Sequence, residues 1–400
     1  MPSYRYVAKD LQGKIYKGIL EASSEREVRK LLKARKLYVV SIKKETGLWK
    51  TLTYKKKVTL PELVLFTSQF ATLLRSGIIL TECLSTLASQ TDNAYFKDVL
   101  LDVRKNVDAG LSLSEALSKY PDVFPKIFIS LVRTGEVTGS LDLMLDRLSK
   151  YFDSQHELRE KIKSATTYPT IVIIAAIVVV IFMLTFVVPT FQRIYGRTNV
   201  PLPFPTRITI FLGNFVKNNI LIILVLLALL IAGARQSLRN KKIKRWWDEN
   251  KLKIPKIGKL WRQVLLTRFS GTFYVLLTGG ILITQSLEIL EDVIGNLYFS
   301  EHLRKILSGV LEGRNLSDMM DEEVFTPLLK QMVVIGERSG RLDTMLEEYT
   351  KFAEREIDIA TKRLTAMIEP ALTIFLGVVV FFIAISMYLP MFNMVRLFRR

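Results

Sequence analysis

The sequence contains few of the residues that build most catalytic and metal sites. Its 400 residues include one cysteine, Cys83, and two histidines, His156 and His302. A lone cysteine excludes an intramolecular disulfide and is typical of a reducing compartment, so we expect Cys83 to be a small buried hydrophobic residue. Two histidines alone do not assemble a histidine-based zinc site, and we expect both on solvated helices among charges.

Motifs that bind nucleotides or activate a nucleophile are also missing. The chain has no GxxxxGK[ST] loop, no GxGxxG after a strand and no nucleophile elbow. Residues 1–10 contain no apolar run, so we expect no cleaved signal peptide. We therefore predict a protein that is not an enzyme and that uses no cofactor.

Charge is absent from two long apolar runs. Residues 170–188 and 371–389 each hold nineteen positions without Asp, Glu, Lys or Arg. At about 1.5 Å per residue, each is long enough as a helix to cross a hydrocarbon core of about 30 Å. A third run, residues 211–234, is interrupted only by Lys217, whose side chain we expect to reach a headgroup. The sequence predicts three transmembrane helices that lack the usual groups of a proton or ion path.

Basic residues outnumber acidic ones by 57 to 38, which gives a formal charge of +19. Residues 235–262 hold eleven Lys or Arg and two Asp or Glu, a net charge of +9 directly after the apolar run over 211–234. The positive-inside rule places this segment in the cytoplasm. Because Trp246, Trp247 and Trp261 lie among its cations, we favour contact with anionic membrane lipids over nucleic acid.

This orientation predicts a cytoplasmic N-terminus and an external C-terminus, although Arg396, Arg399 and Arg400 then lie on the unfavoured side. In chain order we predict a small α+β domain over 1–45, a basic linker over 46–60, a first cytoplasmic helical bundle over 61–168, a transmembrane helix over 170–188, an external loop over 189–210, a second transmembrane helix over 211–234, a basic cytoplasmic linker over 235–262, a second cytoplasmic bundle over 263–369, a third transmembrane helix over 371–389 and a tail over 390–400.

The chain contains an internal sequence repeat. Residues 60–191 recur as residues 263–392, with an offset of 203 before a two-residue contraction and of 201 after it. Phe66 thus corresponds to Phe269, and Pro169 to Pro370. The apolar periodicity of each copy is helical, for example at Leu141, Leu145, Leu148 and Phe152. The fold class is therefore mostly α: a polytopic membrane protein with two repeated helical bundles.

The repeat is clearest in a Gly-Glu-x-x-Gly-x-Leu-Asp motif. Its positions are Gly135, Glu136, Gly139, Leu141 and Asp142 in the first copy and Gly336, Glu337, Gly340, Leu342 and Asp343 in the second. Glycines end helices and allow close helix approach, and an aspartate in a first helical turn suits the helix dipole. The motif is a packing element on this interpretation. Alternatively, the glutamates hold a partner or a cation.

Each copy then runs a charged helix toward its apolar run, which begins behind Pro169 or Pro370. Proline here suits a kink or a first helical turn. The two helices are either rods that transmit motion from the bundles to the membrane or simple linkers.

The first 42 residues have the pattern of a small domain of their own. Residues 4–8, 15–22 and 38–42 are strand-like, and residues 10–14 form a turn. Ser24 and Glu27 predict a capping box before a helix with Val28, Leu31 and Leu32 on one face. A domain of this size suits docking better than catalysis.

Together these features resemble the inner-membrane platform proteins of type II secretion systems and type IV pili (the GspF/PilC family). The resemblance covers nearly the whole chain and includes the N-terminal positions Tyr4, Tyr6, Ala8, Asp10 and Gly13. It implies a non-enzymatic protein of the inner membrane whose external loop is periplasmic. It further implies coupling of a cytoplasmic assembly ATPase to polymerisation of pilin or pseudopilin subunits and to protein secretion. Other inner-membrane assembly proteins and a homo-oligomer are implied as partners.

The alternative from a different class is a small membrane transporter or channel with a path between its helices. Solute flux in liposomes without any partner would favour it. The near absence of charge in the apolar runs speaks against it.

Overall fold

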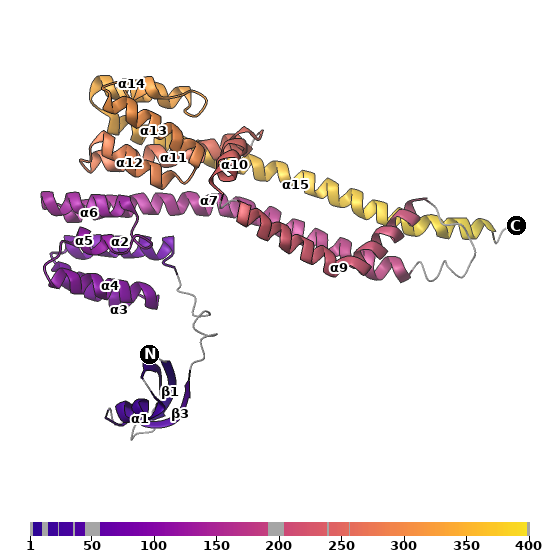
Figure 1. Cartoon of the computed structure of the whole chain (residues 1–400). Helices are drawn as coiled ribbons and strands as arrows, with labels where there is room; N and C mark the ends of the chain where they lie inside the picture. The colour runs from indigo at the N-terminus through magenta and orange to yellow at the C-terminus, as the bar shows by residue number, and fades with distance from the viewer. Residues whose placement is uncertain are drawn as a thin grey trace. The chain divides into compact units, whose positions relative to one another are not determined.

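The protein, represented by a computed structural model, is mostly helical (Figure 1). The structure describes residues 3–9, 15–22, 24–34, 37–44, 57–190, 204–237, 240–255 and 257–397. Two compact units are present, an N-terminal unit over residues 1–58 and a larger helical unit that begins at Thr59.

The N-terminal unit is a three-stranded antiparallel sheet with one helix. Its elements are β1 (Ser3–Lys9), β2 (Ile15–Glu21), α1 (Glu25–Ala34) and β3 (Tyr38–Lys44). The strand order is β2-β1-β3, so the first strand is central. The predicted strands and helix are thereby confirmed, whereas the predicted turn over residues 10–14 lies outside the described residues.

The core of this unit contains Tyr4 from β1 together with Val28 and Leu32 from α1. Because Val28 and Leu32 are one helical turn apart, they face the sheet together. Leu31 is exposed. The expectation that Leu31 shares the buried face is therefore wrong, since it lies to the side of that stripe.

The first bundle consists of helices, as its apolar periodicity predicts. They are α2 (Leu60–Arg75), α3 (Leu80–Gln90), α4 (Ala94–Asp108), α5 (Leu113–Ser118), α6 (Lys126–Thr138) and the first turns of α7 (Leu141–Phe182). Thr59 and Glu62 form a capping box at the start of α2, which satisfies backbone donors that the helix leaves open. Cys83 is buried in α3 as expected, and burial raises the pKa of its thiol.

The second bundle repeats this order. Its elements are α11 (Ile257–Thr278), α12 (Ile283–Ile294), α13 (Leu297–Leu311), the 3₁₀ turn η2 (Ser317–Met319), α14 (Pro327–Ser339) and the first turns of α15 (Leu342–Leu397). A further helix, α10 (Lys241–Lys253), precedes it and packs on α11 and α13.

Equivalent phenylalanines form the two cores. The ring centres of Phe66 and Phe96 are 5.2 Å apart in the first bundle, and those of Phe269 and Phe299 are 5.9 Å apart in the second. All four rings are buried. Aromatic pairs at this distance stabilise a core beyond the effect of buried area. Each copy therefore has its own core, which satisfies a basic requirement of an independent domain.

Helices α7 and α15 continue from the bundles into the apolar runs. The helix α7 leads into a π-helical turn, η1 (Met183–Val187), and α15 runs on for 56 residues. Between them in the sequence lies α9 (Phe204–Ser237), which packs against η1 and α15. Figure 1 shows these long helices beside one another. The helix α9 begins before the predicted start at residue 211, so residues 204–210 are helical and not loop.

Two helices in the described part of the chain are long and apolar enough to cross a membrane, those over Leu141–Thr190 and Leu342–Ser386. A third qualifies if the two parts of α9, bent by 46° relative to each other, form one span. The second predicted crossing, over residues 211–234, thus corresponds to a bent helix. Its contacts are close, since a Cβ on Gly213 of α9 would lie 2.6 Å from the Leu184 carbonyl oxygen.

Candidate functional site

The repeated motif forms the corner between two helices in each bundle. Helix α6 ends at Gly139 and α14 at Gly340, and these residues have φ angles of +68° and +67°. Such left-handed geometry is strained for residues that carry a Cβ. The second glycine of each motif copy therefore ends one helix and turns the chain into the next.

The first glycine of the motif lies where the two helices touch. A Cβ on Gly135 would be 2.9 Å from the Leu141 Cα atom, and one on Gly336 would be 2.8 Å from the Leu342 Cα atom. Both distances are shorter than ordinary carbon contacts, which optimally lie at about 3.5–4.0 Å. The partner atoms belong to the backbone, so they move only if the helix moves. A larger residue would separate the helices at this corner.

The motif glutamates hold the start of a third element. In the first bundle the backbone N–H groups of Leu113 and Ser114, at the start of α5, donate to the two carboxylate oxygens of Glu136, the second at 3.0 Å. In the second bundle Leu316 and Ser317 donate to Glu337 at 2.6 and 3.1 Å. A carboxylate at a helix N-terminus satisfies open donors and interacts favourably with the helix dipole.

The remaining motif positions lie just beyond the corner. Leu141 is half-buried and Leu342 is buried, while Asp142 and Asp343 lie in the first turns of α7 and α15. Acidic residues there are favoured by the helix dipole. The structure therefore brings all five motif positions of each copy together inside one bundle, in two separate clusters.

The two prolines lie inside continuous helices and not in first turns. Proline has no N–H, so in α7 Pro169 leaves the carbonyl of Ala165 without its usual helical partner. The Thr365 hydroxyl of α15 lies 3.5 Å from that carbonyl oxygen and 3.0 Å from the Thr361 carbonyl oxygen, and its single proton can be donated to either. The neighbouring helix thus supplies a polar group where the proline removes one.

Contacts between the bundles involve residues that the repeat pattern does not single out. The hydroxyls of Tyr151 and Thr272 are 3.0 Å apart, and Ser154 donates to Glu354 at 2.7 Å. Burial raises the pKa of the Tyr151 phenol, an effect that its hydrogen bond to Thr272 opposes. These pairs are separated by more than a hundred residues in the chain, so no local pattern could reveal them.

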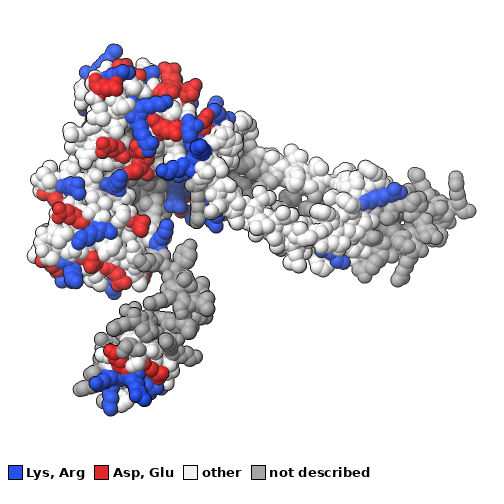
Figure 2. All heavy atoms as spheres, in the orientation of Figure 1, with Lys and Arg blue, Asp and Glu red and all other residues white. Residues whose placement is uncertain are grey.

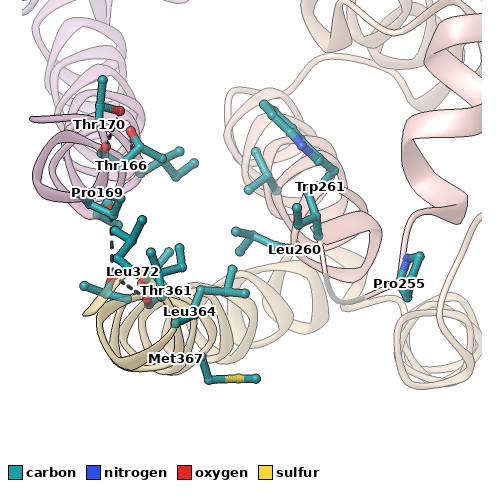
Figure 3. A pocket seen from close by; sticks show the side chains of 17 residues that line it. Thr166, Pro169, Thr170, Pro255, Leu260, Trp261, Thr361, Leu364, Met367 and Leu372 are labelled. Atoms are coloured by element: carbon teal, nitrogen blue, oxygen red, sulfur yellow. Dashed lines mark hydrogen bonds between the residues drawn. The ribbon is translucent and has the colours of Figure 1, made fainter. Parts of the chain in front are cut away.

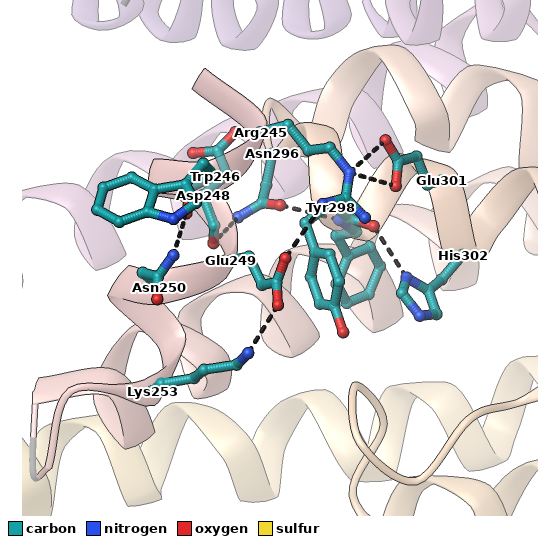
Figure 4. A network of polar contacts seen from close by, with 11 residues as sticks. Arg245, Trp246, Asp248, Glu249, Asn250, Lys253, Asn296, Tyr298, Glu301 and His302 are labelled. Atoms are coloured by element: carbon teal, nitrogen blue, oxygen red, sulfur yellow. Dashed lines mark hydrogen bonds and ion pairs between the residues drawn. The ribbon is translucent and has the colours of Figure 1, made fainter. Parts of the chain in front are cut away.

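A polar network attaches the basic helix α10 to α13 (Figure 4). Arg245 donates to Glu301 at 2.9 Å and to Glu249 at 3.1 Å. The buried Asp248 accepts a hydrogen bond from the Leu297 N–H at 2.9 Å. Because a buried carboxylate is costly without such partners, Asp248 fixes the position of α10.

His302, on α13, also lies in this region. His302 was expected on a solvated helix face, but only 8% of its surface is exposed, and its Nδ1 atom lies 2.9 Å from the Tyr298 carbonyl oxygen. The ring packs edge-on against Tyr298. Its sequence neighbours are charged, but α10 packs on α13, and the Asp321 carboxylate lies 3.6 Å from the His302 Nε2 atom. No group of three or more possible metal ligands occurs among the residues that the structure describes.

Charge is distributed unevenly over the larger unit. Figure 2 shows acidic and basic side chains interspersed on the visible face of both bundles, whereas the long extensions of α7, α9 and α15 are almost uncharged. A surface that is apolar over such a length is typical of a protein that contacts lipid or another protein.

Comparison with known proteins agrees with this architecture. The family described as type II secretion system (T2SS), protein F matches residues 66–189 and 269–390, and the family of its N-terminal domain matches residues 1–43. The chain is 38% identical to type IV pilus assembly protein PilC of Thermus thermophilus, over 99% of this chain and 98% of that protein. It is 31% identical to type II secretion system protein F of Pseudomonas aeruginosa, over 98% of this chain and 99% of that protein.

The two matched segments coincide with the two copies of the repeat, and each contains one bundle and the apolar helix that follows it. The relatives include both pilus assembly and secretion proteins. By its sequence and its duplicated helical architecture, the chain belongs to the type II secretion system protein F family.

Proposed function

We propose that the chain is an inner-membrane platform protein of a machine that assembles pili or secretes proteins. The observation that supports this most directly is the pair of unbroken helices, α7 and α15, each of which joins a motif corner to an apolar run. The names of the relatives support the same role. The platform is the proposed link between a cytoplasmic assembly ATPase and pilin or pseudopilin subunits in the membrane.

The proposed orientation places residues 1–168 and 235–369 in the cytoplasm and residues 189–210 in the periplasm. It is supported by the net charge of +9 over residues 235–262. The boundaries of the crossings, 170–188, 211–234 and 371–389, remain part of the proposal. A crossing built from α9 would be a bent one.

Coupling would work by rigid-body motion. The bundles are packed units, so a force on one of them shifts its corner and not single side chains. Because α7 and α15 begin at these corners, a small rotation of a bundle moves the apolar end of its helix. Contacts between α7 and α15 would make the two helices move together.

Two exposed residues mark where a partner could contact the bundles. Ile79 is 70% exposed, and Leu282, its equivalent in the second copy, is 72% exposed. Both lie just before a helix, after a glycine turn. An isolated exposed hydrophobic residue is common, but the same exposed position in both copies favours a partner contact. We propose that the assembly ATPase docks here, and that the complete platform is a homo-oligomer.

The test uses site-specific cross-linking in the full chain. A photo-activated group is attached to a cysteine introduced by Ile79→Cys or Leu282→Cys in a Cys83→Ser background, with exposed Lys97→Cys on α4 as the control. The assembly ATPase should cross-link at positions 79 and 282 and not at 97. Equal labelling at all three positions would refute the docking site. Flux of small solutes through liposomes that contain only this protein would instead favour a channel.

A further inference from the structure

An apolar cavity of about 640 Å³ lies where α7 and α15 pass the start of α11. Its walls include Ile162 and Pro169 from α7, Trp261 and Val264 from α11, and Leu364 and Leu372 from α15. Figure 3 shows Leu260 and Trp261 pointing toward the space beside these two long helices. The volume lies within the range of about 300–1,000 Å³ that is usual for small-molecule sites.

The threonine hydroxyls around the cavity already have hydrogen-bond partners. The hydroxyls of Thr166, Thr361 and Thr365 donate to carbonyls of their own helices at 2.9, 2.8 and 3.0 Å. None of these hydroxyls needs a hydrogen bond from an occupant. Ordered water requires about two to four polar partners, which these walls do not offer. An apolar occupant such as a hydrocarbon chain therefore suits the cavity walls best.

The position of the cavity shows how hydrocarbon could reach it. Its wall on α7 runs from Ile162, among charged residues, to Thr170, where the uncharged run begins. An acyl chain in a bilayer could enter from the side, without crossing water. A helix of a partner protein would bring peptide groups and bulkier side chains into a space bounded by three helices.

Cations lie near the α11 wall. The Nζ atom of Lys251 is 5.9 Å from the centre of the Trp261 ring, and Lys259 is exposed two residues before Trp261 on the same helix. The surrounding segment, residues 235–262, has a net charge of +9. Basic segments beside a membrane attract anionic lipids, at about 1 kcal/mol per cation near the surface.

We propose that this cavity holds one acyl chain of an anionic phospholipid, whose headgroup lies against the basic segment between α9 and α11. The proposal rests on the proposed crossing of the membrane by α7 and α15. A bound lipid would fill the space between the two long helices and α11. It would thus keep the second bundle packed against both helices where they meet the bilayer.

The test measures fluorescence of Trp261 in the full chain, with the other three tryptophans, Trp49, Trp246 and Trp247, changed to Phe. The protein is reconstituted in vesicles that contain phosphatidylglycerol or phosphatidylcholine with brominated acyl chains, which quench nearby tryptophan. Quenching should saturate at a low fraction of the anionic lipid. The apparent preference over phosphatidylcholine should be roughly fivefold if one cation contributes.

Cavity-filling variants locate the bound chain. Ala165→Phe on α7, and independently Ala371→Phe on α15, adds bulk to the cavity lining and should abolish the saturable quenching. Ala175→Phe, on the exposed outer face of α7 and outside the cavity, should leave it unchanged. Saturable quenching that survives both cavity variants would overturn the proposal, as would equal quenching by the two lipids. Failure of the protein to float with vesicles would refute the membrane crossing itself, which is a separate result.

Discussion

Replacing Glu136 by Gln tests whether the repeated motif acts inside its bundle. Its carboxylate accepts hydrogen bonds from the N–H groups of Leu113 and Ser114. A glutamine keeps one acceptor oxygen but presents an NH₂ group to the second N–H, so one bond is lost and the charge disappears. A hydrogen bond to a charged group contributes about 1.5–3 kcal/mol. Local opening of the α5 N-terminus should therefore rise roughly 10- to 100-fold.

Hydrogen exchange followed by mass spectrometry on the full chain in lipid nanodiscs measures this opening directly. Peptides that cover residues 112–118 should exchange faster in Glu136→Gln, while peptides of the second bundle should not change. Glu337→Gln should show the reverse pattern at η2, because it holds Leu316 and Ser317 in the same way. The two copies thus serve as controls for each other.

Val137→Ala provides the matched control, since Val137 follows Glu136 directly and is 84% exposed. It should leave exchange in α5 unchanged. If Glu136→Gln also leaves exchange unchanged but abolishes cross-linking to the ATPase, the packing account is wrong. The glutamate would then act as a partner contact.

Three further outcomes are expected. Gly135→Ala should lower the free energy of unfolding by about 1–3 kcal/mol, the usual cost of overpacking, because the new Cβ meets the backbone of α7; a thermal melt without change would contradict this. Tyr151→Phe should cost about 1 kcal/mol through the lost hydrogen bond to Thr272. Because the pKa of Tyr151 is raised in the folded protein, its contribution to stability is complete below the unfolded pKa of about 10 and is lost as pH rises through the folded pKa. The stability of Tyr151→Phe should therefore fall less steeply with rising pH than that of the unsubstituted protein in alkaline thermal melts. Exchanging the exposed ion pair between the bundles, Lys126→Asp with Asp292→Lys, should change stability by less than about 1 kcal/mol, and a larger loss would show that the pair is more than a surface contact.

Local chemistry made much of the fold predictable. The helix ends at Gly139 and Gly340 follow from the left-handed geometry that glycine accepts. The duplication predicted two similar helical bundles, and equivalent phenylalanines form the core of each. Each of these features depends on contacts within a short segment or within one copy of the repeat.

Features that depend on distant contacts could not be predicted in this way. The sequence showed that Glu136 belongs to a repeated motif. It could not show the hydrogen-bond partners of Glu136 at the start of α5, which lie more than twenty residues away in the chain. His302 was wrongly expected in solvent because hydrophobic periodicity does not show that α10 packs over α13. The bend in α9 likewise could not be predicted, because the sequence has no proline at its centre.

Comparison of the two copies distinguishes the contacts that fold each bundle from the contacts that join the two bundles. The motif corner is the same in both copies, down to the two backbone donors that each glutamate accepts. The contact between the bundles, in contrast, uses residues that differ between the two copies. Tyr151 corresponds to Phe352, which has no hydroxyl, and Thr272 corresponds to Gln69. The hydroxyl pair that joins the bundles within one chain therefore cannot form between Phe352 and Gln69. A contact between chains that used these equivalent positions would lack this hydrogen bond, so the contact inside each chain has a polar pair of its own.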